Sequence, residues 1–584
     1  MSKSFQFGHG NMIFSFIISF ENDLPVSKYL YNITFLIIHI FKSLLYLVYY
    51  VNIMDSICYS QACKSIAVEL ENNSNMSLKE INKIISLTCS AYHLTVVPKK
   101  EHIIPYLPKN SNYRDILVVK PAKTASGVAV IAVMPRPYDC PHGKCIYCPG
   151  GLEYNTPMSY VGTEPATKIA QSFEYDAYYQ IKSKLNQLYQ RGHNITKIEL
   201  VIVGGTFPFM PENYQREFVK KCFDALNDDL SSTTLEESCR KNEQARIRCV
   251  GFTVETKPDY CKEKHLDLML ELGITRIEIG VQTLEENIYK LVNRGHNLTD
   301  VKHSFQIARD CGYKIVAHMM PGLPGSTPES DINGFKTLLE NDLFKPDMLK
   351  IYPTLVLKNT GLYKLYINKK YDAYTEEDIV NILVEVKKLI PPWVRIMRIQ
   401  REIETSDIIA GSKKGNIRQI AIKKLKDLGL KCNCIRCREV GLQKIKNLNQ
   451  EEITLNRIDY LASEGKEVFL SMENKDKNLL FGFLRLRNIP FSHRKELHHV
   501  NNKTSAIIRE LHVYGQVVDV GQKKGPLSFQ HTGLGLHLME EAEKISKEEF
   551  QVDSLSVISA IGTRAYYRKL GYVQNGPYVT KQLK

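Results

Sequence analysis

Residues 127–151 read GVAVIAVMPRPYDCPHGKCIYCPGG, and this stretch decides how the chain is expected to fold. Its first part is an apolar, β-branched run, which predicts a buried strand over residues 127–134. Cys140, Cys145 and Cys148 follow this strand directly, crowded into nine positions. Three thiolates at this spacing indicate a metal site whose fourth ligand lies elsewhere, or whose fourth position is left open for a substrate.

Apolar runs and amphipathic stretches alternate along the chain from this strand onward. Similar apolar runs predict strands at residues 198–203, 247–252, 276–281, 314–319 and 348–353. Between them lie amphipathic stretches of helical length, such as residues 262–273 and 375–390. Such alternation implies parallel strands joined by crossover helices, and six units favour closure into a complete or partial barrel. In barrels of this kind the chemistry takes place at the carboxyl ends of the strands.

Polar or glycine-rich residues stand at the ends of these predicted strands. Gly204, Gly205 and Thr206 follow the second strand, Glu255 follows the third and Gln282 follows the fourth. The sequence HMMPGLPG ends the next strand at residues 318–325. A Gly-Gly pair alone indicates only a tight turn, but its repetition alongside polar residues favours a functional edge of the barrel.

After Trp393 the pattern changes to a basic connector over residues 395–403 and 413–441, which includes Cys432, Cys434 and Cys437. A different sheet is then expected, with strands at residues 467–472, 479–487, 505–518 and 554–560. The loop QHTGLG at residues 530–535 precedes a predicted helix at 536–548. Free N–H groups and the positive end of the helix dipole make such a helix N-terminus a site for a pyrophosphate.

Composition narrows the class of protein. A chain of 584 residues is expected to hold two or three domains. Lys and Arg number 77 against 63 Asp and Glu, a net charge of +14 that suits a polyanionic partner, although solubility alone also explains it. Six of the 14 cysteines fall in two tight clusters, which favours metal chemistry in a reducing compartment over a disulfide framework.

The N-terminal residues differ from the rest of the chain. Residues 11–20 and 29–51 are apolar, and the second run is long enough to span a bilayer, although His39 and Lys42 lie inside it. Two interpretations stay open. The segment at 29–51 is either a membrane anchor with the catalytic part facing the cytosol, or an artefact upstream of a true start at Met54.

The three cysteines and the strand ends together resemble the radical S-adenosylmethionine (SAM) superfamily. A zinc knuckle with His142 as its fourth ligand is the alternative for these cysteines in an isolated peptide. The resemblance implies that Cys140, Cys145 and Cys148 hold a [4Fe-4S] cluster whose fourth iron binds SAM. It also implies that Gly204 and Gly205 let the backbone approach the amino group of SAM. The four residues between Cys140 and Cys145 depart from the commonest superfamily spacing, which has three.

The loop formed by Gln530, Gly533 and Gly535 resembles the acetyl-CoA loop of GNAT acetyltransferases. A radical SAM barrel followed by a GNAT domain resembles one family, the catalytic subunits of the Elongator complex. The similarity runs from about residue 80 to the C-terminus. It includes, in order, CPHGKCIYCPGG, GGTF, ETKPDYC, RIEIGVQ, NRGH, AHMMPGLPG, YPTLV, RELHVYG, FQHTGLG and GTRAYYRKLGYVQNGPYV.

The family resemblance implies that the protein carboxymethylates the wobble uridine of tRNA at C5. A 5′-deoxyadenosyl radical made from SAM would activate the acetyl group of acetyl-CoA. Other Elongator subunits, a homodimer within the complex, and a location in the cytoplasm and also the nucleus are implied as well. Lys197 and Tyr567 are the implied catalytic residues, with Tyr567 an acid or hydrogen-bond donor near the thioester, whereas Tyr566 is expected to pack. The implied acetyl-CoA contacts are Lys197, Glu510, Leu511, His512, Val513, Leu534, Gly535, Leu536 and Tyr567.

Cys432, Cys434 and Cys437 resemble a linker zinc site that some members of this family have. Three thiolates on a basic loop form most of such a site, and three free thiols are the alternative. Basic side chains of the connector are expected to contact tRNA phosphates, while some of them only face solvent. These side chains are Arg395, Arg398, Arg401, Lys423 and Lys424.

The expected fold is α/β: a partial (β/α) barrel of the radical SAM type followed by an α+β GNAT domain. The predicted domains are an N-terminal extension (1–53), a helical tRNA-binding region (54–120), the radical SAM domain (121–400), a basic linker with the zinc site (401–450) and the GNAT domain (451–584). The alternative function is a lysine N-acetyltransferase acting on a protein such as histone or tubulin. The cluster cysteines, which amine acetylation does not need, and the basic connector count against it.

Overall fold

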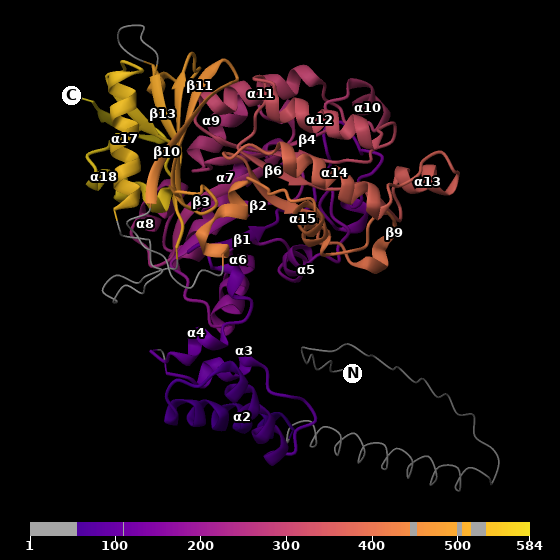
Figure 1. The fold of residues 1–584 in the computed structure, drawn as a ribbon, viewed down its shortest axis with the longest axis vertical. Helices are drawn as coiled ribbons and strands as arrows, with labels where there is room; N and C mark the ends of the chain where they lie inside the picture. Colours follow the sequence, from indigo (N-terminus) through magenta and orange to yellow (C-terminus); the bar gives the residue numbers. More distant parts are fainter. Residues whose placement is uncertain (1–54, 109, 444–452, 499–504, 516–532, 584) are drawn as a thin grey trace, which may run out of the picture. The chain divides into compact units, whose positions relative to one another are not determined.

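The computed structural model describes residues 55–108, 110–443, 453–498, 505–515 and 533–583 (Figure 1). The chain divides into two compact units, Met1–Leu117 and Val118–Lys584, and each is described by itself. Three features predicted from the sequence lie outside the described residues: the extension at 1–53, its apolar segment at 29–51, and Gln530 of the acetyl-CoA loop.

The first unit is helical in its described part. It consists of helical residues 55–72, α2 (Leu78–Ala91), α3 (Lys100–Ile103) and α4 (Tyr113–Leu117). Ser77 begins α2 with a capping box, because its hydroxyl accepts from the N–H of Glu80 and the Glu80 carboxylate accepts from the N–H of Ser77 at 2.7 Å. Apolar residues at helical spacing on α2, including Ile81 and Ile85, are buried against the preceding helix.

Among the described helices, none combines the length and the apolar character needed to cross a membrane. This finding overturns the predicted membrane-anchored location. The segment at 29–51, on which that prediction depended, lies outside the part of the chain that the structure describes.

A seven-stranded parallel sheet forms the centre of the second unit, in the order β1-β2-β3-β4-β5-β6-β8. Within the described residues β8 pairs with β6 and not with β1, so the barrel is partial and the predicted fold class is confirmed. The strands are β1 (Ala129–Val133), β2 (Lys197–Ile202), β3 (Arg248–Thr256), β4 (Arg276–Gln282), β5 (Lys314–Met319), β6 (Met348–Ile351) and β8 (Arg395–Ile399).

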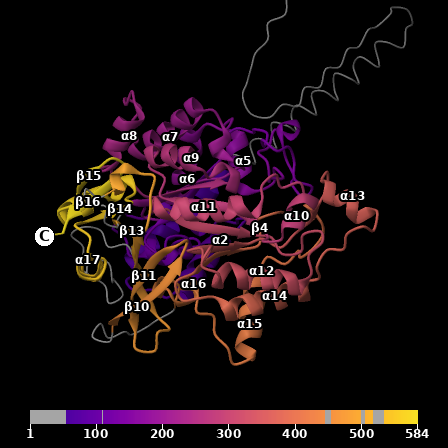
Figure 2. The same cartoon turned by 90° about the horizontal axis from the view of Figure 1, so that it is seen from above.

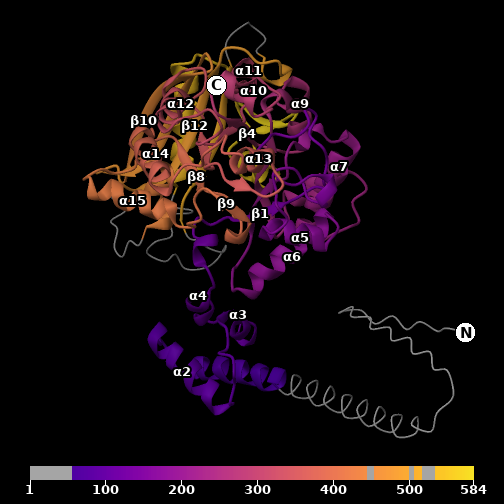
Figure 3. The same ribbon diagram turned by 90° about the vertical axis from the view of Figure 1, so that its right-hand side faces the viewer.

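Helices connect these strands and cover the outer side of the sheet. In Figure 2, α7, α9, α11, α12 and α14 follow one another around that side, and Figure 3 shows α5 and α6 beside β1. The helices are α5 (Pro165–Ser172), α6 (Ala177–Gln190), α7 (Glu212–Asn227), α8 (Leu235–Asn242), α9 (Glu263–Glu271), α10 (Glu286–Leu291), α11 (Leu298–Asp310), α12 (Pro328–Glu340), α13 (Gly361–Ile367), α14 (Glu376–Leu389) and α15 (Ile417–Asp427).

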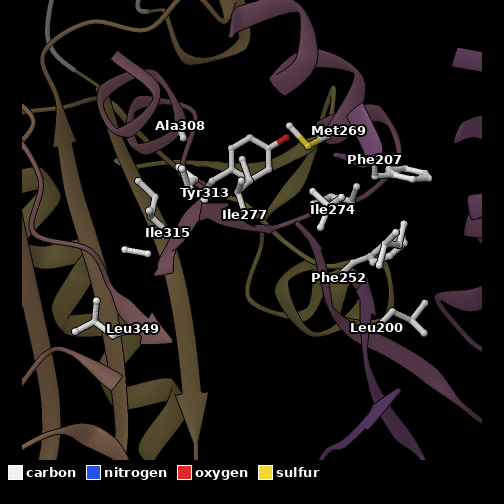
Figure 4. Close-up of a cluster of buried hydrophobic side chains, with 14 of the residues drawn as sticks. Leu200, Phe207, Phe252, Met269, Ile274, Ile277, Ala308, Tyr313, Ile315 and Leu349 are labelled. Carbon is white, nitrogen blue, oxygen red and sulfur yellow. The ribbon is translucent and has the colours of Figure 1, made fainter. Parts of the chain in front are cut away.

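The main hydrophobic core lies between this sheet and its helices. Figure 4 shows Leu200 of β2, Phe252 of β3 and Ile277 of β4 beside Met269 of α9 and Tyr313. All five side chains are fully buried. Burial on both sides explains why these strands appear in the sequence as continuous apolar runs.

One barrel strand was assigned to the wrong element. Residues 395–399 were expected in the basic connector, but they form β8 and pair with β6. The charge of Arg395 made this strand look like part of an exposed segment. In the structure that charge is neutralised inside the protein by an ion pair with Glu439.

The second sheet has the order β10-β11-β12-β13-β14-β16-β15, and β13 and β14 pair in parallel within an otherwise antiparallel arrangement. α17 (Leu534–Glu548) packs on β12 and β13, on the face turned away from the barrel (Figure 1). This is the predicted α+β domain. Its other elements are β10 (Ile453–Ala462), β11 (Gly465–Asn474), β12 (Leu480–Ile489), β13 (Ser505–Val513), β14 (Ser554–Val557), α18 (Arg564–Lys569), β15 (Val573–Asn575) and β16 (Tyr578–Gln582). The remaining elements are α16 (Ile435–Arg438) and the antiparallel pair β7 (Val356–Leu357) and β9 (Ile408–Ala410).

Four fully buried arginines join the barrel to the second sheet, and we call them the arginine seam: Arg309, Arg485, Arg487 and Arg509. Arg509 of β13 donates to Asp347, which precedes β6, at 2.6 and 2.8 Å. The same guanidinium donates to Glu467 of β11 at 2.9 Å. A β-bulge places Arg509 there, because Arg485 pairs with Glu510 and the next residue of β12 pairs with Ile508, so Arg509 has no residue opposite.

The other members of the seam make equally direct contacts. Arg487 of β12 donates to Asp310, at the end of α11, through Nε at 2.9 Å. Arg485 donates to Glu510 at 2.9 Å and to the carbonyl of Trp393 at 2.8 Å. Each buried guanidinium thus faces a carboxylate, which is the condition under which buried charges are tolerated.

Candidate functional site

A cavity of about 490 Å³ runs along the inside of the barrel, from the cysteines at the carboxyl ends of the strands to Arg276, Met348 and Arg395 at their amino ends. Its lining includes the cluster cysteines on one side and residues of the second sheet on the other. Glu510, His512 and Tyr514, at and just after the end of β13, belong to the second group. Two of the predicted acetyl-CoA contacts, Glu510 and His512, therefore line the same cavity as the three cysteines.

Tight turns hold the three cysteines after β1. The N–H of Gly143 donates to the Cys140 carbonyl and that of Cys148 to the Cys145 carbonyl, both at 3.0 Å. Cys148 Sγ accepts from the N–H of Ser159 at 3.1 Å. Burial raises the pKa of the Cys148 thiol to about 11, so a positively charged group is needed to favour its thiolate.

The arrangement of these thiols fits a cluster better than a single ion. A zinc ion has ligands about 2.3 Å away, which brings tetrahedral sulfurs to within about 4 Å of one another. In the described part of the chain, two groups of three ligand side chains have all ligand atoms within 4.8 Å, and Cys140, Cys145 and Cys148 are not one of them. More widely spaced thiols facing a cavity suit a [4Fe-4S] cluster.

Gly204 and Gly205 follow β2 and are both required by the backbone there. Their φ angles are +125° and +99°, in a region that side chains disfavour. A Cβ on Gly204 would also press on Met134 and Pro157 at 3.3 Å. The N–H of Gly204 donates to the Glu255 carboxylate at 3.2 Å, so it lies beside the predicted strand-end acid.

A buried ionic group crosses three neighbouring strands in the wall of the cavity. Glu278 of β4 accepts from His318 of β5 at 2.9 Å and forms an ion pair with Lys350 of β6. Burial opposes ionisation of Glu278, but Lys350 outweighs it and holds its pKa below the usual range. Glu255, Glu278 and His318 bring ligand atoms within 4.8 Å, yet the Lys350 ammonium lies between the two carboxylates, 3.9 Å from Glu255. A cation of the protein itself thus contacts both carboxylates, which disfavours a metal ion at the same position.

The predicted acetyl-CoA residues come together from both sheets. Lys197, at the start of β2, is half-buried, and partial burial lowers the pKa of its ammonium. Burial likewise lowers the pKa of His512 to about 4, and the charge of Lys197 acts in the same direction. Glu510 is held by Arg485 of the seam. These three predicted side chains thus surround one region between the barrel and β13.

The start of α17 lies close to Tyr566 and Tyr567. Gly533 precedes the helix with φ +89°, and a Cβ on Gly535 would meet the Tyr566 hydroxyl at 3.3 Å and Val513 at 3.5 Å. Tyr567 is buried, and burial raises the pKa of its phenol, so it is a hydrogen-bond donor rather than a base. The remaining predicted contacts flank these positions, namely Leu511 on β13 and Leu534 and Leu536 in α17.

The second cysteine cluster is compact. The sulfurs of Cys432, Cys434 and Cys437 all lie within 4.8 Å of one another, as a single tetrahedral ion requires. Lys387 donates to Cys432 Sγ at 3.8 Å. Hydrogen bonds from the neighbouring thiols lower the pKa of Cys434. Among the described residues this group contains no fourth His, Cys, Asp or Glu ligand.

The predicted tRNA-contacting cations differ in their surroundings. Arg395 is paired with Glu439 and donates to Tyr514, so it is engaged inside the protein. Arg398 and Arg401 line the cavity, and Lys424 of α15 donates to an amide oxygen of α14 at 2.5 Å. Only part of the predicted set is therefore placed to meet a ligand.

Several cavity residues escaped the sequence analysis: His318, Lys350, Lys257 and Arg294. The first two alternate with apolar residues inside strands that read as buried, and that alternation is the one signal that could have revealed them. Arg294 lies in the NRGH sequence after α10, which was used for its similarity alone.

A partial parallel barrel with three such cysteines at the cavity end of its first strand is the architecture of radical SAM enzymes, and this chain is an enzyme of that class. Residues 134–333 match the Radical SAM superfamily and residues 346–427 the Radical_SAM C-terminal domain. Membership of the superfamily implies a [4Fe-4S] cluster and SAM.

More narrowly, the chain belongs to the Elongator complex protein 3 family. Residues 59–125 match the ELP3 N-terminal domain. The chain is 43% identical to the Elongator complex protein 3 of Homo sapiens over 520 residues, which cover 86% of this chain and 93% of the human one. It is 42% identical to that of Saccharomyces cerevisiae over 544 residues, with 90% and 96% covered. An archaeal structure, Methanocaldococcus infernus Elp3 with an N-terminal deletion, superposes with a TM-score of 0.69 and 41% identity, covering 78% of this chain and all of that one.

Proposed function

We propose that this protein carboxymethylates the wobble uridine of tRNA at C5, using SAM and acetyl-CoA. The observation that supports the proposal most is the shared cavity, since Cys148 lies in the same lining as Glu510 and His512 of the second sheet. With cluster and SAM bound, the site would supply a SAM-derived radical able to take hydrogen from the acetyl methyl group. Carbon–carbon bond formation needs the two cofactor regions to be connected by one cavity, whereas amine acetylation does not.

On the barrel side, residues of the protein would hold the cluster and orient SAM. Cys140, Cys145 and Cys148 would bind the cluster, and the turn at Gly204 and Gly205 would leave room for the amino group of SAM. On the other side, Lys197 and His512 would face the thioester of acetyl-CoA. The N-terminus of α17 at Gly535 would bind the pyrophosphate. Tyr567 would donate a hydrogen bond to the thioester oxygen and so favour its hydrolysis after transfer.

Partners follow from charge and family. The net charge of +14 suits tRNA, and Arg398 and Arg401 at the cavity are placed to meet its phosphates. The relatives are named as components of the Elongator complex, so we propose association with other Elongator subunits, as a homodimer within the complex.

The direct test is anaerobic reconstitution with iron and sulfide, followed by addition of SAM, acetyl-CoA, reductant and tRNA. Analysis of the tRNA nucleosides should show a carboxymethyl group at C5 of the wobble uridine. If histone or tubulin peptides are acetylated as well as tRNA is modified, and iron is not needed, the lysine acetyltransferase alternative is the better one.

Exchange of Tyr567 for phenylalanine should reduce acetyl-CoA hydrolysis at least tenfold. The phenol is buried and protonated, so the variant removes a donor and leaves the ring in place. We expect tRNA to stimulate hydrolysis in the wild-type protein, because binding of tRNA should expose or align the acetyl group for reaction. Release of free CoA, measured with and without tRNA, checks both expectations.

Tyr566→Phe is the matched control, because Tyr566 is adjacent but 40% exposed. It should retain hydrolysis within about twofold. Equal losses in the two variants would contradict a specific role for Tyr567.

We also propose that Cys432, Cys434 and Cys437 hold zinc separately from the cluster. Their compact geometry leads us to expect that the triple serine variant loses zinc and keeps iron, with metal content measured by mass spectrometry. Unchanged zinc in that variant would show that the ion binds elsewhere. Cys239→Ser, at a buried thiol outside both clusters, should change neither metal.

A further inference from the structure

Cys145 differs from the other two cluster cysteines in the donors that reach its sulfur. His142 Nε2 lies 3.3 Å from Cys145 Sγ, and Arg294 Nη1 lies 3.7 Å from it. Cys148 receives the backbone N–H of Ser159 instead. The Cys145 sulfur is therefore the one approached by a guanidinium and an imidazole together.

A third residue decides which way the imidazole donates. Lys257 Nζ lies 2.7 Å from His142 Nδ1. An ammonium has three donors and no acceptor, so Nδ1 must accept from it. The imidazole proton then resides on Nε2, which donates to Cys145. The chain Lys257–His142–Cys145 thus has a fixed direction, and Lys257 acts on the sulfur through His142.

Two glycines leave room for these donors. A Cβ on Gly295 would collide with the Cβ and ring of His142, and one on Gly280 would collide with the guanidinium of Arg294. Arg294 donates to the Gly280 carbonyl at 2.8 Å, which fixes the guanidinium beside the sulfur. His142 and Arg294 could not take their positions beside Cys145 if residues 295 and 280 carried a Cβ.

The unusual spacing of the cysteines provides this arrangement. The four residues between Cys140 and Cys145 include His142 and Gly143, and Gly143 turns the loop with φ +82°. The longer loop therefore carries its own donor to the sulfur at its end.

We propose that Lys257, acting through His142, and Arg294 together set the reduction potential of the cluster by hydrogen bonding to Cys145. This inference rests on the proposed placement of the cluster on Cys140, Cys145 and Cys148. Reduction adds negative charge that is shared by the cysteine sulfurs. Donors and cations at a sulfur stabilise the reduced state and raise the potential. Lys257 is a positioning residue, since it touches the imidazole and not the sulfur.

The test is the midpoint potential of reconstituted protein, measured by titration with the cluster signal as readout and iron content as a check. A hydrogen bond to a charged group is worth about a tenfold change in equilibrium. His142→Phe should therefore lower the ratio of reduced to oxidised cluster about tenfold at fixed potential, equivalent to about 59 mV for one electron. Lys257→Met should shift it in the same direction, and Lys257→Arg should restore it.

The double variant decides whether Lys257 acts through His142. His142→Phe with Lys257→Met should match His142→Phe alone, because the ammonium has lost its intermediary. Additive shifts would overturn the relay. In the cluster-free protein, ¹⁵N shifts of His142 should report a proton on Nε2, and this preference should weaken in Lys257→Met.

Lys144→Met is the matched control. Lys144 is adjacent to Cys145, but its ammonium donates to the Gly150 carbonyl at 2.6 Å and to Glu153 at 3.1 Å rather than to sulfur. It should leave the potential close to that of the wild type. Equal shifts in Lys144→Met and Lys257→Met would overturn the proposal, as would loss of iron from His142→Phe. A tRNA that stays unmodified while these potentials shift as expected would count against the proposed function alone.

Discussion

Replacement of Cys148 by alanine is expected to abolish the iron–sulfur absorbance and all cleavage of SAM. Cys148 is buried at the cavity, and two cysteines cannot hold a cluster that already leaves one iron open to SAM. Affinity for acetyl-CoA should change little, because the proposed contacts of that cofactor lie on β2, β13, α17 and α18. Absorbance after anaerobic reconstitution, release of 5′-deoxyadenosine and a binding titration with acetyl-CoA give the three readouts.

Cys222→Ala is a suitable control, because Cys222 is a buried thiol of α7 within the hydrophobic core. It should keep iron and SAM cleavage, at some loss of stability. Zinc in place of iron in the anaerobically purified wild-type protein would contradict the cluster, and so would undiminished SAM cleavage in Cys148→Ala.

The second large effect concerns stability. Arg509→Met should lower the free energy of unfolding by about 3–5 kcal/mol, because it leaves Asp347 and Glu467 buried without their shared guanidinium. Urea denaturation followed by tryptophan fluorescence is a direct measurement. The chain has one tryptophan, Trp393, whose ring stacks on Tyr460 of the second sheet with centroids 4.3 Å apart. Its signal therefore reports the junction at which the arginine seam lies.

Arg457→Met is the comparison. Arg457 of β10 also makes paired contacts, with Asp459 and Glu549, but about a third of its side chain is exposed. Solvent-exposed ion pairs contribute about 1 kcal/mol or less, so this variant should lose no more than that. If the two variants were equally stable, the seam would not hold the sheets together.

Much of the barrel could be predicted from the sequence. Strands buried on both faces appear as apolar runs, and those at 198–203, 276–281 and 314–319 were placed within one residue of β2, β4 and β5. β8 could not be found in this way, because Arg395 and Arg398 look like a charged surface until Glu439 and the cavity are known.

The second sheet also contains buried charged residues that the sequence pattern does not identify as buried. Arg485 and Arg487 alternate with apolar residues in β12, a pattern that predicts an outward, solvated face. They point instead at carboxylates that the barrel and neighbouring strands supply, such as Asp310. A pattern of single residues cannot reveal partners such as Asp310, which is 177 positions away from Arg487. The cofactor sites were easier, because the cysteines and glycines that form them are close together in the sequence.

The arginine seam also bears on modularity. A fragment holding only the second sheet would present Arg487 and Arg509 to water without Asp310 and Asp347, and a fragment holding only the barrel would strand those two acids. Apolar side chains of the second sheet, such as Ile507, also belong to the core of the barrel, so neither half is expected to be a self-sufficient building block. We therefore expect the two halves to have been kept together in one chain during evolution, since separation would break the buried ion pairs between them.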